Sequence, residues 1–350
     1  MKIGIVGRGY GRYGLLPAFR MVKGVSIEAL CATRMEVVLA DARDANIPRA
    51  YDDWRRMLAN EQLDAIVVAV PPRASGPICR AALSIGLPLF TEKLPAATLS
   101  EVRELNEIAQ RSAITTCIDY IFPELETFRR AKDLLSDGAI GTIRLVEVRW
   151  MFESYDNRMG LRTWKTNSNE GGGVLRHFLC HSLHYVEWFL GRIERVRATL
   201  VHDANIGSGG DCYVSVTSAT ESGVLVNLVG SSVLPKGPGH SVAFYGSAGT
   251  LSLENPLSDV VRGFALTLGT SERRKMIVTE EEHSTVDESV DARVGASAAL
   301  AQRFVDALSG SPPRRPFPAL REALRVSTLI EAICNSNSLD RSVRLDKFAE

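Results

Sequence analysis

Four glycines near the N-terminus have the spacing of a turn that can bind a phosphate. An apolar run ends at Val6, and glycines then occupy positions 7, 9, 11 and 14, with apolar residues following at helical spacing. In such a strand, turn and helix, glycines let the backbone approach a pyrophosphate while the first N–H groups of the helix point at it. The residues predicted to bind a dinucleotide here are Gly7, Gly9, Tyr10, Gly11 and Arg12.

The glycines can be read in two registers. Gly9, Gly11 and Gly14 fit the G-x-G-x-x-G fingerprint literally. Gly7 and Gly9 directly follow the strand and put Arg12 in the place of the third glycine. We favour the second register, because the phosphate turn should begin where the strand ends. A glycine-rich loop shaped only by tight packing is the alternative to both.

The end of the second predicted strand, at 25–32, carries Thr33 and Arg34 and no acid. An Asp or Glu there normally bonds the ribose hydroxyls of NAD, whereas an Arg accommodates the 2′-phosphate of NADP. A guanidinium pairs with phosphate in a charge-assisted fork, so the sequence favours NADP(H), with NAD(H) also possible. Alternatively, Arg34 is an ordinary solvated residue and Glu36 bends back to the ribose.

Two further strand ends are expected to border the cofactor. Val70, Pro71 and Pro72 end the apolar run 63–70, and Glu92 and Lys93 follow a short strand at 88–91. In a parallel sheet both turns lie at the carboxyl edge, where ligands bind. A desolvated Lys93 ammonium would hydrogen-bond a substrate hydroxyl or carbonyl there; a solvated lysine is the alternative.

Three of the six histidines, His177, His181 and His184, fall along one face of a helix predicted over 174–190. A metal site is disfavoured because HExxH is missing and no acid or cysteine pattern completes the ligand set. Structural histidines remain an alternative. We favour proton transfer, because the unperturbed pKa of histidine lies nearest neutrality.

Strands and helices alternate up to residue 118, which predicts an α/β domain with a doubly wound parallel sheet, a Rossmann domain, over 1–120. The expected helices are 35–45, 51–60, 75–85 and 99–111, and the last strand is 114–118. From 121 to 350 we expect an α+β domain with an open, mostly antiparallel sheet. Its predicted strands are 143–151, 193–202, 212–220, 223–231, 242–245, 250–254 and 343–345, and its helices are 123–136, 174–190, 297–308 and 318–335, the last packing back toward the first domain. The polar stretch 271–294 is expected to form hairpin edges and a surface loop.

Composition points to a small partner molecule. Lys plus Arg and Asp plus Glu each number 41, so no net charge attracts nucleic acid or an anionic membrane. No apolar run approaches the roughly 20 residues that span a bilayer, and no signal peptide is recognisable, so we expect a cytoplasmic protein. Six cysteines are scattered without C-x-x-C pairs, and we expect neither a metal site nor disulfides.

From residue 1 to about 345, the chain resembles the glucose-fructose oxidoreductase, inositol dehydrogenase and rhizopine catabolism (Gfo/Idh/MocA) family. The shared blocks are Gly-Ile-Val-Gly-x-Gly at 4–9, Thr-Glu-Lys at 91–93 where the family has Glu-Lys-Pro, Gly-Ala-Ile-Gly-Thr-Ile-Arg at 138–144, and Gly-Gly-Gly-Val-Leu at 171–175 followed by His181. The resemblance implies hydride transfer between a nicotinamide and a hydroxyl or keto carbon of a sugar, sugar derivative or cyclitol. It also implies a homodimer or homotetramer formed through the C-terminal sheet.

Carried over by position, Lys93 matches the family's active-site lysine and His181 its histidine. Thr33 and Arg34 match the Ser-Arg of NADP users. Four departures stand out. Leu94 replaces the proline after the lysine, and His177 and His184 stand where acids are common. Ser75 replaces a frequent histidine.

The expected mechanism passes hydride from NADPH to a keto carbon held against Trp164. Lys93 or His181 gives the proton, and His177 orients or relays it. The residues expected to contact the substrate are Tyr120, Trp164, Lys165, His177 and His181. Two rivals remain: a redox-neutral enzyme of the same fold that uses nicotinamide transiently for elimination or epimerisation, and a non-catalytic nucleotide-sensing protein.

Overall fold

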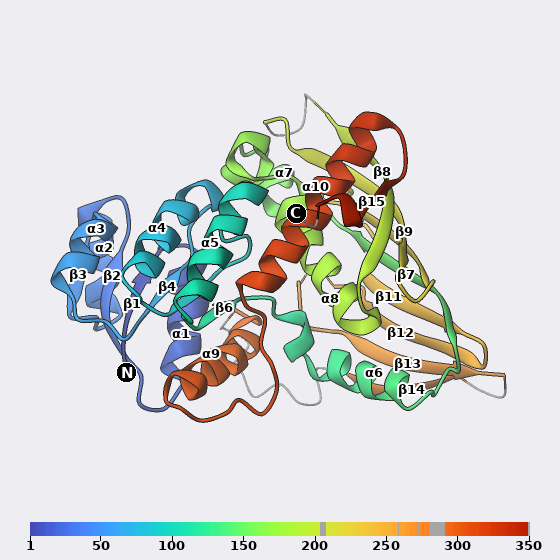
Figure 1. Cartoon of the computed structure of the whole chain (residues 1–350), viewed down its shortest axis with the longest axis horizontal. Coiled ribbons are helices and arrows are strands. Elements are labelled where there is room, and N and C mark those ends of the chain that lie inside the picture. The colour runs from blue at the N-terminus through green and yellow to red at the C-terminus, as the bar shows by residue number, and fades with distance from the viewer. Residues whose placement is uncertain (204–207, 258, 272–273, 280–290, 349–350) are drawn as a thin grey trace. The chain divides into compact units, whose positions relative to one another are not determined.

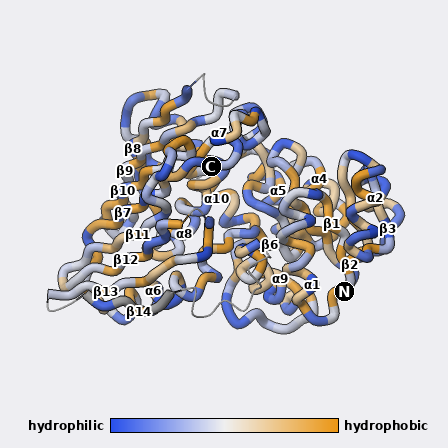
Figure 2. Tube along the Cα trace, turned by 180° about the vertical axis from the view of Figure 1, so that it is seen from behind, coloured by the Kyte–Doolittle hydropathy of each residue, from blue (hydrophilic) through white to orange (hydrophobic). Residues whose placement is uncertain are grey.

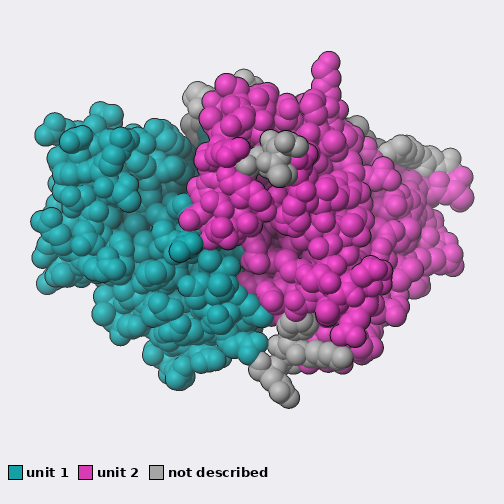
Figure 3. All heavy atoms as spheres, turned by 90° about the horizontal axis from the view of Figure 1, so that it is seen from above, with its two compact units in different colours: residues 1–121, 286–325 teal, residues 122–285, 326–350 magenta. Residues whose placement is uncertain are grey.

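The structure, a computed structural model, describes residues 1–203, 208–257, 259–271, 274–279 and 291–348. It divides into two compact units (Figure 3). Unit 1 comprises residues 1–121 and 286–325, and unit 2 comprises residues 122–285 and 326–350. In this division residues 286–325, which lie inside the predicted second domain, belong to unit 1.

Unit 1 is built on a six-stranded parallel sheet (Figure 1). Its strands are β1 (Lys2–Val6), β2 (Ser26–Cys31), β3 (Arg49–Tyr51), β4 (Ala65–Val68), β5 (Leu89–Thr91) and β6 (Thr116–Ile118), in the order β3-β2-β1-β4-β5-β6. The predicted doubly wound parallel sheet is confirmed. The sequence did not predict β3, because three residues of an edge strand show no periodicity.

The helices of unit 1 include one that arrives from far along the chain. They are the π-helical turn η1 (Gly11–Leu15), α1 (Leu16–Arg20), α2 (Met35–Asp44), α3 (Trp54–Asn60), α4 (Pro72–Ser84), α5 (Leu99–Arg111) and α9 (Val294–Leu308). α9 packs on α1, where Val294 and Ala298 form a small buried cluster with Ala18. The helix α10 (Leu320–Leu339) contains the boundary between the two units.

Unit 2 is built on a nine-stranded sheet in the order β14-β13-β12-β11-β7-β10-β9-β8-β15. Its strands are β7 (Ile143–Met151), β8 (Ile193–His202), β9 (Asp211–Thr220), β10 (Leu225–Ser231), β11 (Gly239–Gly246), β12 (Gly249–Asn255), β13 (Ala265–Thr270), β14 (Arg274–Thr279) and β15 (Val343–Arg344). All its pairs are antiparallel except β7 with β10. The mostly antiparallel sheet is therefore confirmed, with β13 as a strand that the sequence did not predict. Most of the polar stretch 271–294 lies outside the described residues.

The helices of unit 2 are mostly short. They are η2 (Phe122–Glu124), α6 (Glu126–Ser136), α7 (Tyr155–Arg158), η3 (Trp164–Thr166), η4 (Ser168–Glu170), the π-helical turn η5 (Leu175–Leu179), α8 (Cys180–Leu190) and η7 (Leu345–Phe348). The predicted helix 174–190 thus begins as a π-helical turn.

The core of unit 2 lies on one face of its sheet. Side chains alternate between buried and partly exposed along β7 and β11, as period 2 requires. Figure 2 shows both hydrophobic and hydrophilic residues along the strands of this sheet. Aromatic rings fill the buried face: Phe122 lies within 5.6 Å of Phe128, Trp150 and Tyr185, measured between ring centroids. No helix in the described part of the chain is both long and apolar enough to cross a bilayer.

Candidate functional site

The glycine turn leaves β1 at a position where only glycine fits. Gly7 is the first residue after the strand and has φ +122°. A Cβ on Gly7 would lie 2.1 Å from the carbonyl oxygen of Ala69, after β4. A Cβ on Gly9, by contrast, would have no atom within 4 Å. The turn therefore begins at Gly7, and above Gly9 the backbone is open to a ligand, as a pyrophosphate site requires.

Gly14, the last glycine of the literal fingerprint, has a different role. A Cβ there would lie 2.0 Å from the ring of Tyr10. That ring packs beneath the Arg293 guanidinium, 4.0 Å from the ring centroid, and its hydroxyl lies 2.9 Å from Ser297 Oγ. The side chain of Tyr10, predicted to bind the cofactor, is thus engaged within unit 1, and the side chain of Arg12 lies beside the ring of Tyr13.

The end of β2 shows the predicted basic character. Thr33 and Arg34 are exposed, and Arg34 immediately precedes α2. The nearby Glu36 is exposed in the first turn of that helix. The sequence did not predict that Arg8, inside the glycine turn, donates from Nε to Asp41 on α2 over 2.8 Å. That bond fastens the turn to the helix that follows β2.

The proline turn follows β4, the neighbour of β1, and Lys93 follows β5, the next strand in the sheet. Pro72 is the first residue of α4, preceded by Pro71 and Val70, and Lys93 lies half-buried two residues after β5. The peptide between Lys93 and Leu94 is cis. Because β1, β4 and β5 are adjacent and parallel, their carboxyl ends lie on one edge within about 10 Å, two strand spacings. The structure therefore brings the glycine turn, the proline turn and Lys93 to one edge.

A buried acid that the sequence did not predict lies at the same edge. Asp119 follows β6, is 1% exposed and accepts a 2.9 Å hydrogen bond from Ser297 Oγ. Glu92, which follows β5, occupies the adjacent position on the neighbouring strand. Burial, and then the neighbouring Glu92 charge, raise the pKa of Asp119 well above its usual range. Ser297 lies 178 residues away in sequence, so only the fold reveals this group. Tyr120, the next residue and a predicted substrate contact, is completely buried.

The three histidines in unit 2 have different surroundings. His177, in η5, is half-buried with its ring centroid 5.1 Å from that of Trp164. His181 is 7% exposed and its ring lies 5.2 Å from Phe122. His184 is buried, and burial lowers its pKa to about 3. His177 lies in a π-helical turn and His181 and His184 lie in α8, so the α-helical spacing assumed for the three histidines does not hold over the whole segment.

Two buried aspartates hold the loop that carries Trp164 and Lys165, and the sequence predicted neither. Asp156 accepts from the Thr163 hydroxyl and lies 3.5 Å from Lys165 Nζ. Asp211 accepts a 2.8 Å hydrogen bond from the N–H of Leu175, at the start of η5.

The three-glycine run packs tightly against this loop. A Cβ on Gly172 would lie 2.2 Å from the carbonyl oxygen of Trp164, and one on Gly173 would lie 2.2 Å from Asp211 Oδ1. Because these glycines have no side chain, the backbone that leads into η5, which carries His177, can pack directly against the loop that carries Trp164. Within unit 2, the structure brings Trp164 and His177 together and places Lys165 beside them. No group of three His, Cys, Asp or Glu side chains suited to a metal occurs among the described residues.

The fold and the glycine turn define a class: proteins with a dinucleotide-binding Rossmann unit joined to an open antiparallel sheet. Residues 1–120 match the family described as "Oxidoreductase family, NAD-binding Rossmann fold", and residues 128–252 match the "GFO/IDH/MocA C-terminal domain". The chain belongs to the Gfo/Idh/MocA family of oxidoreductases, whose first domain binds a nicotinamide dinucleotide.

Similar proteins support this assignment over the whole chain. An uncharacterized oxidoreductase of Synechocystis is 22% identical over 348 residues, covering 95% of this chain and 92% of that protein. A D-xylose dehydrogenase of Paenarthrobacter nicotinovorans is 28% identical over 211 residues, covering 56% of this chain and 54% of the relative, so that match spans about half of each protein. The solved structure of a levoglucosan dehydrogenase in complex with NADH has a TM-score of 0.84 at 15% identity and covers 99% of both chains, which shows the shared fold.

Proposed function

We propose that the protein is an NADP(H)-dependent oxidoreductase that transfers a hydride to or from a keto or hydroxy carbon of a sugar, sugar derivative or cyclitol. The observation that carries the proposal is the edge shared by the open backbone at Gly9 and by Lys93. A dinucleotide bound across that edge would have Lys93 near its reactive end. The xylose and levoglucosan dehydrogenases among the similar proteins support a sugar-like substrate.

The residues have distinct proposed roles. Gly7, Gly9 and Gly11 hold the pyrophosphate with their backbone, and Thr33 and Arg34 bind the 2′-phosphate. Val70, Pro71, Pro72 and Glu92 border the rest of the dinucleotide. When bound, the nicotinamide supplies or accepts the hydride. Lys93 stabilises negative charge at the reacting oxygen, and Lys93 or His181 donates or accepts the proton there.

His177 occupies a position where an acid is common in the family, and we propose that it orients the substrate or relays a proton. Trp164, whose ring lies against His177, and Lys165 would line the substrate. An imidazole can accept and donate a proton as a carboxylate does, but it is cationic when protonated, whereas a protonated carboxyl group is neutral. The proposal therefore does not require the missing acid.

A panel of sugars, cyclitols and nucleotide-linked sugars, incubated with NADP⁺ or NADPH, tests this function. We expect a net change in nicotinamide absorbance with at least one compound. Product formed without any net change would instead support a redox-neutral enzyme. Tight nucleotide binding without any product over the whole panel would support a nucleotide-sensing protein.

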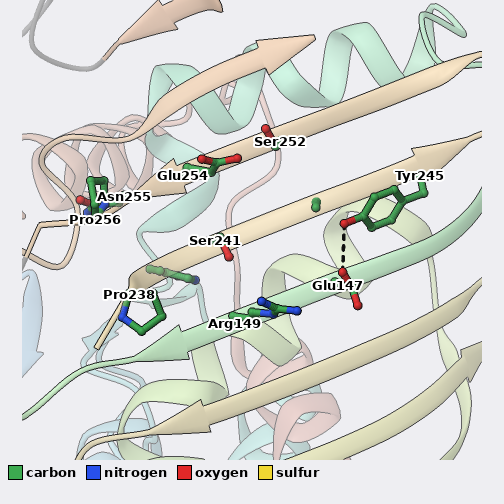
Figure 4. A pocket seen from close by; sticks show the side chains of 11 residues that line it. Glu147, Arg149, Pro238, Ser241, Tyr245, Ser252, Glu254, Asn255 and Pro256 are labelled. Carbon is green, nitrogen blue, oxygen red and sulfur yellow. Dashed lines mark hydrogen bonds between the residues drawn. The ribbon is translucent and has the colours of Figure 1, made fainter. Parts of the chain in front are cut away.

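We also propose that the open face of the unit 2 sheet joins copies of this chain into a homodimer or homotetramer. This face holds a pocket of about 320 Å³ with a mixed polar lining on β7, β11 and β12 (Figure 4). There the Tyr245 hydroxyl donates to Glu147 over 2.9 Å, next to Arg149 and Glu254. A face with charges of both signs and small residues such as Ala243 suits contact with an identical face.

Light scattering of the wild type and of Ala243→Arg tests the assembly. We expect a dimer or tetramer for the wild type and a smaller species for the variant, because a large charged side chain on this face blocks close contact and must lose its hydration on association. An Arg substitution of the exposed Ala74 on α4 of unit 1 is the control and should leave the mass unchanged. A monomeric wild type would contradict the proposal.

A further inference from the structure

We propose that the buried Asp119, next to Glu92, holds a proton and releases it when the oxidised, cationic form of the nicotinamide binds, whereas binding of the reduced form leaves the proton in place. The inference rests on the proposed cofactor site and adds a function to it. The carboxyl pair would recognise the oxidation state of the nucleotide by charge.

The backbone holds the two acids side by side. In the pairing of β5 with β6, Thr91 lies opposite Ile118, so Glu92 and Asp119 are the next residues on neighbouring parallel strands. Such positions are about 4.8 Å apart. The N–H of Asp119 also donates to the carbonyl of Thr91 over 3.0 Å, which continues the ladder by one bond. The strands therefore fix the spacing of the two side chains.

The surroundings of Asp119 favour a protonated carboxyl. Ser297 Oγ donates to Oδ2, and no group that the structure describes donates to the buried Oδ1. The neighbouring acid, Glu92, lies at the adjacent position of the next strand, and an ionised carboxylate cannot donate a hydrogen bond to Oδ1. Two like charges at this separation in a buried site would also repel strongly.

The surrounding charges do not replace that proton. The positive charge of Arg293 acts on Asp119 and favours its ionised form. The Arg293 guanidinium, however, already makes two hydrogen bonds to Asp291, of 2.6 and 2.9 Å. Tyr10, which packs under Arg293, contributes a neutral hydroxyl because burial raises the pKa of that hydroxyl well above its usual range. Lys93, next in sequence to Glu92, is a further cation of this edge. These two cations, Arg293 and Lys93, face three carboxyl groups, those of Glu92, Asp119 and Asp291. One proton on a carboxyl group therefore brings the positive and negative charges closer to balance.

A ligand cation at the carboxyl edge would change this balance. The oxidised nicotinamide ring carries a positive charge and the reduced ring is neutral. A positive charge near the two carboxyl groups stabilises their ionised forms, so Asp119 gives its proton to the solvent. Binding without a positive charge provides no such stabilisation. Proton release on binding is therefore expected with NADP⁺ only.

Calorimetric titrations of the full chain with NADP⁺ and with NADPH, each in two buffers of different ionisation enthalpy near neutral pH, count the protons released. We expect up to about one proton more for NADP⁺ than for NADPH. Equal proton counts for the two nucleotides would overturn the inference. Absence of binding heat with either nucleotide would instead contradict the proposed function, so the two failures are distinguishable.

Two variants and one control locate the proton. Asp119→Asn keeps the shape of the side chain and should abolish the difference between the nucleotides. Ser297→Ala removes a bond that favours the ionised carboxyl, so it should reduce the release. Glu104→Gln on α5 removes a surface carboxylate paired with Arg80 and should leave the release unchanged. A difference that persists in Asp119→Asn would overturn the assignment, and Ser297→Ala decides if that variant does not fold.

Discussion

Gly7 and Gly9 lie two residues apart, yet a methyl group has opposite consequences at the two positions. At Gly7 it would lie 2.1 Å from a carbonyl oxygen of the neighbouring strand end, in a backbone conformation that side chains rarely adopt. At Gly9 it would project into open space. The fold therefore requires glycine at position 7, whereas the proposed pyrophosphate ligand requires it at position 9.

This difference gives a paired prediction. Gly7→Ala should lower the free energy of unfolding by about 1–3 kcal/mol, because the strain adds to the clash. Gly9→Ala should change it by less than about 0.5 kcal/mol but weaken binding of NADPH, because the methyl group separates the backbone from the phosphates. Urea unfolding and calorimetric titration measure the two effects. Normal NADPH affinity in Gly9→Ala would contradict the proposed pyrophosphate site.

Arg34 provides the residue-scale test of nucleotide preference. It is exposed next to Thr33 at the end of β2, where a carboxylate would select NAD. Arg34→Ala should raise the Kd for NADPH about 10-fold or more and leave that for NADH nearly unchanged, because a charge-assisted bond to phosphate contributes about 1.5–3 kcal/mol. Arg43→Ala, in the last turn of α2, is the control. Equal losses for both nucleotides would show that Arg34 does not contact the 2′-phosphate.

At the scale of elements, two histidines make the packing of unit 2 sensitive to acid. His184 lies in α8, and His240 in β11 stacks on Trp150 at 4.1 Å and lies 2.9 Å from the Tyr185 hydroxyl. Burial lowers the pKa of each to about 3. Both imidazoles are therefore neutral in the folded protein, whereas in the unfolded chain they take up protons below about pH 6.5.

The unfolded chain thus binds more protons, and stability must fall as the pH is lowered. The contribution is complete above about pH 6.5, declines below it and levels off below about pH 3. At pH 5 each histidine should cost about 2 kcal/mol, the product of 1.5 pH units and 1.36 kcal/mol. Urea unfolding followed by tryptophan fluorescence at pH 7.5 and 5 measures this, since three of the four tryptophans lie in unit 2.

A variant separates this effect from general acid destabilisation. His184→Gln should reduce the loss of stability between pH 7.5 and 5 by about 2 kcal/mol, even if it lowers the stability at pH 7.5. His202→Gln, at the exposed end of β8, should leave the loss unchanged. An undiminished loss in His184→Gln would contradict a neutral, buried imidazole.

For the whole molecule, sequence periodicity was enough to predict both sheets. The nearly continuous apolar run around β4 reflects a strand that is buried on both faces of its sheet. The alternation of apolar and polar residues in β7 reflects a strand that is buried on one face only. Short edge strands such as β3 were not predictable, because three residues carry no period. The π-helical turn η5, which carries His177, was also not predictable, because the prediction assumed α-helical spacing throughout 174–190.

The candidate site was predictable only where its residues follow strands. Lys93 could be placed on the carboxyl edge because strand ends bring local sequence to a known position. The side-chain direction of Tyr10 and the pairing of Asp119 with Ser297 were not predictable, because α9 returns to unit 1 from 178 residues further along the chain. Contacts of this range depend on topology rather than on local pattern.

The most direct test of hydride transfer is the rate at which NADP⁺ is reduced with the best compound of the sugar panel, in the wild type and in the double variant Lys93→Ala with His181→Ala. Proton transfer by a positioned side chain contributes about 100-fold to 10,000-fold to a rate. Our account predicts a fall of at least about 100-fold in the double variant, with the affinity for NADPH retained. Turnover at the wild-type rate without both side chains would contradict it.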